Sequence, residues 1–184
     1  MRGGDKLLER VDGRPLLALL AGRARAAGCP VLVTLRPGDR ARRAALEGCD
    51  VEVLEVADAA EGMAASLRAG AAAAQGRAGL MVLPGDMPEI GASDMAALCD
   101  AFAARSPAPI LRAAAADGRP GHPVVLPAWC FGRMARLAGD EGARSILCAC
   151  ADRVVLHPLE GVRALTDLDT PEDWAAWRAQ GAAP

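Results

Sequence analysis

The sequence predicts an α/β fold in which a mostly parallel sheet carries helices on both faces. Short apolar runs alternate with helix-like segments as far as residue 105, which is typical of such folds. Residues 80–83 (Leu-Met-Val-Leu) form an uninterrupted apolar run between Gly79 and Pro84-Gly85, and this indicates a central strand buried on both faces. With 184 residues, 52% of them apolar, the chain fits one domain over residues 1–184.

The first half of the chain contains the regular alternation. Pro15 suits the first turn of a helix, and Gly28 follows its end. Ser93 is expected to be the N-cap of a later helix, since Met95 and Leu98 begin an apolar spacing of three and four residues. The expected elements are a short apolar stretch to Val11, helix 15–27, strand 31–34, helix 40–46, strand 51–54, helix 61–75, strand 80–83 and helix 93–104.

The rhythm changes in the second half. Residues 117–123 (Asp-Gly-Arg-Pro-Gly-His-Pro) contain so much glycine and proline that we expect an irregular loop. Thr170, Pro171 and Asp173 have the pattern of a helix start: an N-cap, a proline at N1 and an acid at N3. The other expected elements are strand 109–111, strand 124–126 running against the main direction, helices 129–137 and 143–150, and strands 154–156 and 162–165.

Charge and cysteine content exclude several classes of protein. The net charge is only −2 and the arginines are scattered, so neither a nucleic-acid surface nor a membrane surface is indicated. There is no signal-like start and no run of 18 apolar residues, so we expect a cytoplasmic protein. The six cysteines form no Cys-x-x-Cys pair, which favours reduced thiols over a zinc site or a disulfide framework.

Two charged residues stand out as candidate site residues. Asp86 follows the predicted central strand, at the edge where ligands of α/β sheets bind, although an aspartate there can equally cap a turn. Lys6 is the only lysine beside 20 arginines, and a compact ammonium next to Gly3 and Gly4 suits phosphate binding. The alternative is a frayed terminus with no role.

Further candidates lie in the second half. His122 is expected to be exposed in its loop, where it either contacts a substrate or is merely solvated. Asp140 and Arg144 form a loop-to-helix pair of opposite charges. Three aspartates cluster before the last helix; either all cap it, or two cap it and one binds a metal: Asp167, Asp169 and Asp173. With two histidines and no tyrosine, the sequence favours chemistry driven by metal and charge.

An ordered set of short motifs resembles the MobA-like nucleotidyltransferases, and among them the molybdenum cofactor cytidylyltransferase branch. The motifs span nearly the whole chain: Gly-Gly-Asp-Lys-Leu-Leu (3–8), Gly-Arg-Pro-Leu-Leu (13–17), Gly-Met-Ala-Ala-Ser-Leu (62–67), Leu-Pro-Gly-Asp-Met-Pro (83–88), Gly-His-Pro (121–123), Gly-Asp-Glu-Gly-Ala-Arg (139–144) and Asp-Leu-Asp-Thr-Pro-Glu-Asp (167–173). Each motif is short, and their common order makes the resemblance specific.

The resemblance implies a three-layer α/β/α Rossmann-like (GT-A-like) nucleotidyltransferase fold. It implies Mg²⁺-dependent transfer of a nucleotide, CMP from CTP being favoured, to a phosphorylated acceptor, favoured as molybdopterin, with release of pyrophosphate. A molybdoenzyme or a chaperone is the implied protein partner. Carried over by motif, Asp86 holds Mg²⁺ with Asp169 as a second contact, and Lys6 meets the triphosphate. The other implied site residues are Gly3, Gly4, Gly62, Met63, Ser66 and Gly85 on the nucleotide side and Gly121, His122, Asp140 and Arg144 on the acceptor side.

One departure from the family concerns the start of the chain. In the family a first strand leads into Leu-Ala-Ala-Gly-x-Ser-x-Arg-Met-Gly, whereas this sequence begins at the tail of that motif. We therefore expect the first strand and most of the glycine-rich loop to be missing, which leaves unpaired backbone beside them. Two alternatives stay open: a related transferase with another nucleotide or acceptor, and a truncated, non-catalytic nucleotide-binding domain.

Overall fold

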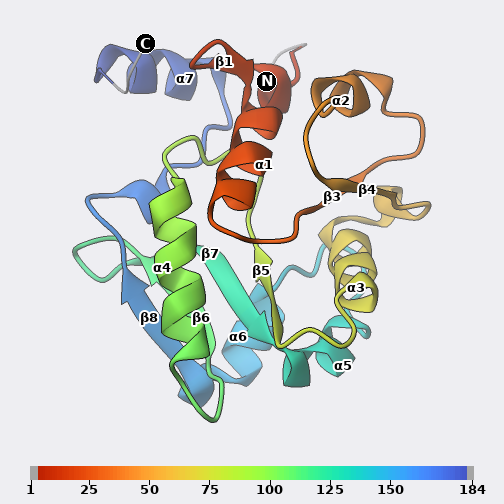
Figure 1. Cartoon of the computed structure of the whole chain (residues 1–184), viewed down its shortest axis with the longest axis vertical. Coiled ribbons are helices and arrows are strands. Elements are labelled where there is room, and N and C mark those ends of the chain that lie inside the picture. The colour runs from red at the N-terminus through yellow and green to blue at the C-terminus, as the bar shows by residue number, and fades with distance from the viewer. Residues whose placement is uncertain (1–3, 182–184) are drawn as a thin grey trace.

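A four-stranded sheet and a two-stranded sheet form the framework of the computed structural model, which describes residues 4–181 (Figure 1). The larger sheet has the order β5–β7–β6–β8, and the smaller one pairs β3 with β4. A tight hairpin near the start joins β1 to β2. The strands are β1 (Arg10–Val11), β2 (Arg14–Pro15), β3 (Leu32–Leu35), β4 (Glu52–Glu55), β5 (Gly79–Val82), β6 (Ile110–Ala114), β7 (Pro120–Pro127) and β8 (Val154–Pro158).

Strand direction makes the larger sheet mixed. Strand β7 runs antiparallel to both its neighbours, with Met81 opposite Val125 and Leu111 also opposite Val125. Strands β6 and β8 are parallel, as are β3 and β4. It follows that β5, β6 and β8 share one direction and β7 alone opposes it. The expected reversal of strand 124–126 is confirmed, and so is the α/β class.

Helices cover both faces of the larger sheet. On one face α3, α5 and α6 pack on alternate strand residues such as Ile110 and Val124. On the other face α4 packs on the intervening residues, Leu111 and Val125 among them. Successive strand residues point to opposite faces, so each strand contributes to both cores. The helices are α1 (Leu16–Ala26), α2 (Arg40–Ala45), α3 (Met63–Ala73), α4 (Ala92–Ala103), α5 (Phe131–Met134), α6 (Arg144–Ala149) and α7 (Pro171–Ala179).

Helix α1 lies between α7 and the β3–β4 pair (Figure 1). One side of the helix, including Leu16 and Leu20, packs with Trp174 and Trp177 of α7. The opposite side packs through Leu17 against the β3–β4 pair. None of the helices in residues 4–181 combines the length and hydrophobicity that crossing a membrane requires.

The predicted central strand lies at an edge. Within the part of the chain that the structure describes, β5 pairs only with β7, and all four of its residues are half-buried. Both faces are nevertheless covered as expected, because Leu80 and Val82 pack on one core and Met81 on the other. An apolar run reports which faces are buried but not how many neighbours a strand has.

The expectation of an irregular loop over residues 117–123 is wrong for its second half, because Pro120–Pro123 belong to β7. This half of β7 extends beyond β5 and pairs with β6, Pro120 lying opposite Ala114 after a register shift. A proline lacks the N–H that a fully paired strand must donate, so prolines are tolerated where one edge of a strand is unpaired. Glycine and proline content alone therefore misled the prediction.

Three smaller expectations also differ. Residues 162–165 form a 3-10 helix (Arg163–Leu165) and not a strand. Helix α4 begins at Ala92, with Gly91 and not Ser93 as its N-cap, because Asp94 accepts the Gly91 N–H at 2.8 Å. The helix expected over 129–137 is divided into a 3-10 turn (Ala128–Cys130) and the short α5. The helix start at Thr170 is confirmed: Thr170 and Asp173 cap each other's backbone N–H.

Candidate active site

Asp86 lies in the turn that follows β5, as the sequence predicts. Its backbone carbonyl accepts the N–H of Leu168 at 3.1 Å, which joins this turn to the segment carrying Asp167 and Asp169. Gly85, just before it, packs against Leu7: a Cβ at Gly85 would lie 3.0 Å from a Leu7 methyl group. Three segments far apart in sequence therefore meet at Asp86.

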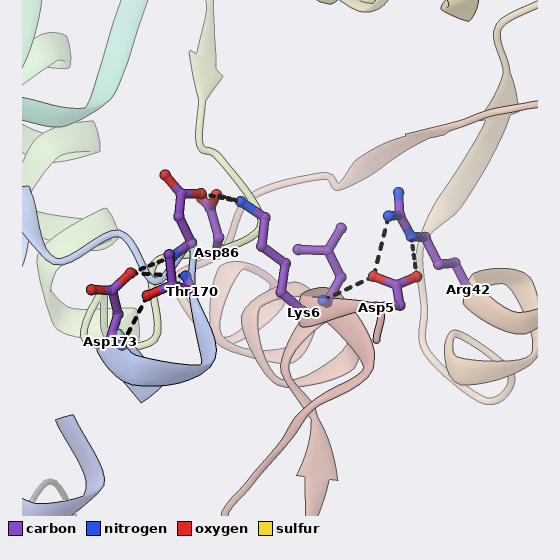
Figure 2. A network of polar contacts seen from close by, with 8 residues as sticks. Asp5, Lys6, Arg42, Asp86, Thr170 and Asp173 are labelled. Carbon is purple, nitrogen blue, oxygen red and sulfur yellow. Dashed lines mark hydrogen bonds and ion pairs between the residues drawn. The ribbon is translucent and has the colours of Figure 1, made fainter. Parts of the chain in front are cut away.

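The ammonium group of Lys6 forms ion pairs with two of these carboxylates, of which Figure 2 labels that of Asp86. Its Nζ is 2.5 Å from Oδ2 of Asp86 and 2.5 Å from Oδ1 of Asp169. Burial by itself lowers the pKa of Lys6, but the hydrogen bonds to Asp169 and Asp86 outweigh it, and the pKa is raised. Lys6 is therefore a permanent cation in this position at neutral pH.

Asp86 also has an unused oxygen. Its side chain is 16% exposed, and its Oδ1 is buried with no hydrogen-bond partner among the described residues. A buried carboxylate oxygen without a partner is costly, so it indicates a position prepared for a donor or a cation. Asp169 is 63% exposed and faces the same ammonium.

The donor set fits Mg²⁺ or Mn²⁺. These ions prefer oxygen ligands and are often held by one or two carboxylates together with substrate phosphates and water. Asp86 and Asp169 supply two such carboxylates, each 2.5 Å from one cation position. Residues 4–181 contain no group of three or more His, Cys, Asp or Glu side chains arranged to hold a metal by themselves.

The turn that carries Lys6 is held in place by a contact that sequence reasoning missed. Asp5 caps the 3-10 helix Lys6–Leu8 by accepting the N–H of Leu7 at 3.0 Å. The same carboxylate binds Arg42 of α2 in a bidentate fashion, at 2.7 and 3.2 Å (Figure 2). Burial raises the pKa of Asp5, but the bonds from Arg42 and Leu7 reverse this and lower it. A frayed start is thus contradicted from Asp5 onward, while Gly4 is an exposed bend and Gly3 lies outside the described residues.

His122 lies in β7 and is half-buried, so the expectation of an exposed loop histidine is wrong. Its Nδ1 is buried without a hydrogen-bond partner among the described residues. Burial lowers the pKa of His122, Arg112 lowers it further, and Asp86 and Asp167 oppose the shift. The ring is therefore neutral at pH 7 and near Asp86, with one nitrogen available to a ligand.

We expect His122 to titrate below its ordinary pKa of 6.5 in NMR spectra of the ring protons. Because Arg112 lowers this pKa and Asp86 raises it, Arg112→Met is expected to move the midpoint upward and Asp86→Asn downward. The unfolded chain takes up this proton at a higher pH than the folded one, so stability should fall as the pH drops below about 6.5. His122→Asn identifies the resonance, and a midpoint above 6.5 in the unaltered protein would contradict the assignment.

Gly121 has a structural role next to His122. A Cβ on Gly121 would overlap the backbone carbonyl of Ala164, in the 3-10 helix Arg163–Leu165. This backbone cannot move aside as a flexible side chain would. Glycine is thus required where β7 and this helix touch, whatever further contact the residue makes with a ligand.

Gly121→Ala is expected to lower the free energy of unfolding by about 3 kcal/mol, and Tm by about 6–12 °C, because the added methyl group forces the two backbones apart. Gly132→Ala is the matched control, since nothing lies within 4 Å of a Cβ there. Thermal melting of both variants provides the measurement. Equal Tm values would show that β7 and the 3-10 helix separate without cost.

A second group of predicted residues meets at the start of α3. Gly62 has a φ of +123°, and a Cβ on it would overlap Oδ1 of Asp140. The N–H of Ala64 donates to the carbonyl of Gly139 at 3.3 Å, and a Cβ on Gly142 would lie 3.1 Å from the Met63 sulfur. The loop 139–142 thus packs directly on the first turn of α3.

Other predicted residues are less closely associated. Ser66 is half-buried in the first turn of α3, and Met63 is 58% exposed. Arg144 is exposed at the first position of α6, and no ion pair in residues 4–181 joins it to Asp140. The structure therefore brings together Lys6, Asp86 and Asp169 with His122 nearby, and separately Gly62, Met63 and Asp140.

Comparison with known sequences gives the class of enzyme, a nucleotidyltransferase, and the family. The sequence profile of the MobA-like NTP transferase domain matches residues 1–154, so the chain belongs to that family. The protein is an enzyme that transfers a nucleotide from a nucleoside triphosphate. No curated protein sequence matched the chain.

Two solved structures of one protein are similar to this chain over most of its length. Rv0371c from Mycobacterium tuberculosis H37Rv is 30% identical, with a TM-score of 0.77 over 95% of this chain and 89% of that one. Its manganese complex is 29% identical, with a TM-score of 0.75 over 93% and 89%.

Two more distant structures support the fold alone. A nucleotidyl transferase from Methanothermobacter is 20% identical (TM-score 0.77, covering 95% and 84%). CMP:2-keto-3-deoxy-manno-octonic acid synthetase complexed with CTP is 13% identical (TM-score 0.75, covering 96% and 91%).

Proposed function

We propose that this nucleotidyltransferase is a metal-dependent cytidylyltransferase that transfers CMP from CTP to a phosphorylated acceptor, with molybdopterin the favoured acceptor, and releases pyrophosphate. The observation that carries the proposal is the position of the Lys6 ammonium, 2.5 Å from both Asp86 and Asp169 and beside the unpartnered Oδ1 of Asp86. Cationic and anionic groups of this kind suit a reaction in which phosphate charge must be neutralised.

Asp86 and Asp169 are the residues that would hold Mg²⁺ or Mn²⁺. The manganese complex of Rv0371c supports the use of a divalent ion by a relative of similar fold. Such an ion would neutralise charge on the triphosphate and orient it. Lys6 would turn its ammonium toward the same phosphates. Its three N–H groups can donate to phosphate oxygens and its side chain is flexible, whereas the two carboxylates only accept hydrogen bonds.

The remaining predicted residues take positioning roles in this proposal. The first turn of α3, with Gly62, Met63 and Ser66, would lie by the nucleotide. His122, neutral and with an unpartnered nitrogen, would orient the acceptor phosphate by a hydrogen bond. Asp140 and Arg144 would line the acceptor side. Since Asp140 lies against Gly62, the loop 139–142 would touch both substrates. A cytoplasmic location and transfer of product to a molybdoenzyme or a chaperone belong to the same proposal.

The test is pyrophosphate release by the purified chain with CTP, GTP or ATP, with molybdopterin present or absent, and with Mg²⁺, Mn²⁺ or a chelator. We expect release only with CTP, molybdopterin and a divalent ion together. Release with another nucleotide would identify the related transferase that the sequence left as an alternative. Binding of CTP without any release would favour the non-catalytic nucleotide-binding domain.

A further inference from the structure

Two cysteines far from the candidate active site lie in direct contact. The Sγ atoms of Cys29 and Cys99 are 3.5 Å apart, although 70 positions separate the residues in sequence. Cys29 follows the turn at Gly28 that ends α1, and Cys99 lies in the middle of α4. These two helices pack against each other, so their contact brings the two thiols together.

Three of the other four cysteines differ from this pair in exposure, and Cys49 is half-buried like the pair. Cys130 and Cys150 are buried in the core formed by α3, α5 and α6, and Cys148 is exposed. Cys29 and Cys99 are both half-buried, so a small oxidant can reach them. Among residues 4–181, Cys29 and Cys99 form the only thiol–thiol contact at hydrogen-bond distance.

The two thiols have different surroundings. Arg25 donates from Nη1 to the backbone carbonyl of Cys29 at 3.1 Å, which places a guanidinium near this cysteine. The thiolate is the form that reacts with oxidants. Burial and the contact with Cys29 raise the pKa of Cys99 to about 11, so this thiol stays protonated at neutral pH. Cys29 is accordingly expected to react first and Cys99 second.

We propose that Cys29 and Cys99 are a redox modification site: a hydroperoxide closes them to a disulfide that ties the end of α1 to α4. The Cys29 thiolate attacks the terminal oxygen of the hydroperoxide and the O–O bond breaks, so that Cys29 becomes a sulfenic acid. The other oxygen leaves as alkoxide or hydroxide and takes up a proton to give an alcohol or water. Cys99 then displaces the hydroxyl group as water. In balance, two thiols and one hydroperoxide give one disulfide, one alcohol (or water) and one water.

The disulfide would act on a helix that also holds the candidate active site. Arg23 of α1 donates from Nη1 to the carbonyls of Pro88 and Ile90, at 2.6 and 3.1 Å, in the segment that follows Asp86. A covalent tie beyond Arg23 restricts the separation of α1 from α4, and it restricts the unfolded chain across a loop of 70 positions. The site is independent of the proposed nucleotide and acceptor.

The test treats the reduced full-length protein with a small excess of hydrogen peroxide, blocks the remaining thiols and maps the peptides without reduction. We expect one intramolecular disulfide, Cys29–Cys99, and a rise in Tm of about 5 °C or more that dithiothreitol reverses. Cys29→Ser and Cys99→Ser should each lose both effects, and Cys148→Ser should keep them.

Recovery of Cys29 and Cys99 as separately blocked thiols after oxidation would overturn the proposal. So would a disulfide formed only between chains through the exposed Cys148. The peptide map of the unaltered protein decides the question even if a serine variant fails to fold. If the disulfide forms and Tm is unchanged, the proposal that it restricts the separation of α1 from α4 is overturned.

Discussion

Replacing Asp86 by asparagine is expected to reduce pyrophosphate release by about 10²–10³-fold or more and to remove the dependence of CTP binding on a divalent ion. The reason is that asparagine keeps the shape of the side chain but loses the charge that would hold the ion. The substitution replaces one of the two carboxylate oxygens with an NH₂ group, which only donates hydrogen bonds and cannot bind a cation. CTP affinity would be measured by calorimetry with and without Mg²⁺ or Mn²⁺, together with thermal melting.

The control for this substitution is Asp152→Asn, which removes one carboxylate from an exposed position away from Asp86. It should leave both affinity and turnover unchanged. For Asp86→Asn the Tm should stay within a few degrees, since its partner Lys6 retains Asp169. A large loss of stability with metal-dependent binding intact would identify Asp86 as a turn cap.

The parts of the fold that the sequence predicted well depend on local physics. Thr170 and Asp173 cap the start of α7 as expected, because both bonds lie within one helical turn. The apolar run at 80–83 forms β5, since packing on both cores requires alternate side chains to be apolar. The reversal of 124–126 followed from the break in the strand–helix rhythm.

The failures share a non-local cause. Residues 120–123 form a strand because β6 pairs with them, and the sequence of the segment itself does not indicate this pairing. Residues 162–165 resembled a strand by composition, yet they form a 3-10 turn whose Ala164 is buried against Gly121. Propensity for strand depends strongly on tertiary surroundings, so short apolar segments of this kind are hard to assign.

The site shows the same division. Asp86 could be singled out because its strand and turn are adjacent in sequence, and Lys6 because it is the only lysine. Their contact could not be predicted, because Lys6 is 80 positions from Asp86 and 163 from Asp169. Asp5 was missed although an aspartate before a helical turn is an ordinary N-cap signal. The bond from Asp5 to Arg42, which fixes this turn, again depends on tertiary packing.

Substituting Lys6 by methionine is expected to change metal binding and turnover in opposite directions. Lys6→Met removes the ammonium that contacts both Asp86 and Asp169. The negative charges of these carboxylates are then less compensated, so a divalent ion should bind the nucleotide-free protein about tenfold more tightly. Turnover should nevertheless fall about 10²-fold or more, because the charge proposed to meet the triphosphate is lost. Manganese binding followed by paramagnetic resonance and pyrophosphate release measure the two effects separately.

Two further variants make this result specific. Lys6→Arg keeps the charge and should keep metal binding weak, while its planar, bulkier head restores turnover only in part. Arg119→Met removes an exposed cation paired with Asp117 and should alter neither quantity. If Lys6→Met weakened metal binding, the ammonium would hold Asp86 and Asp169 in position for the ion and would not compete with the ion for them. If it left turnover unchanged, Lys6 would have no contact with the triphosphate, and Asp86 and Asp169 alone would remain of the proposed site.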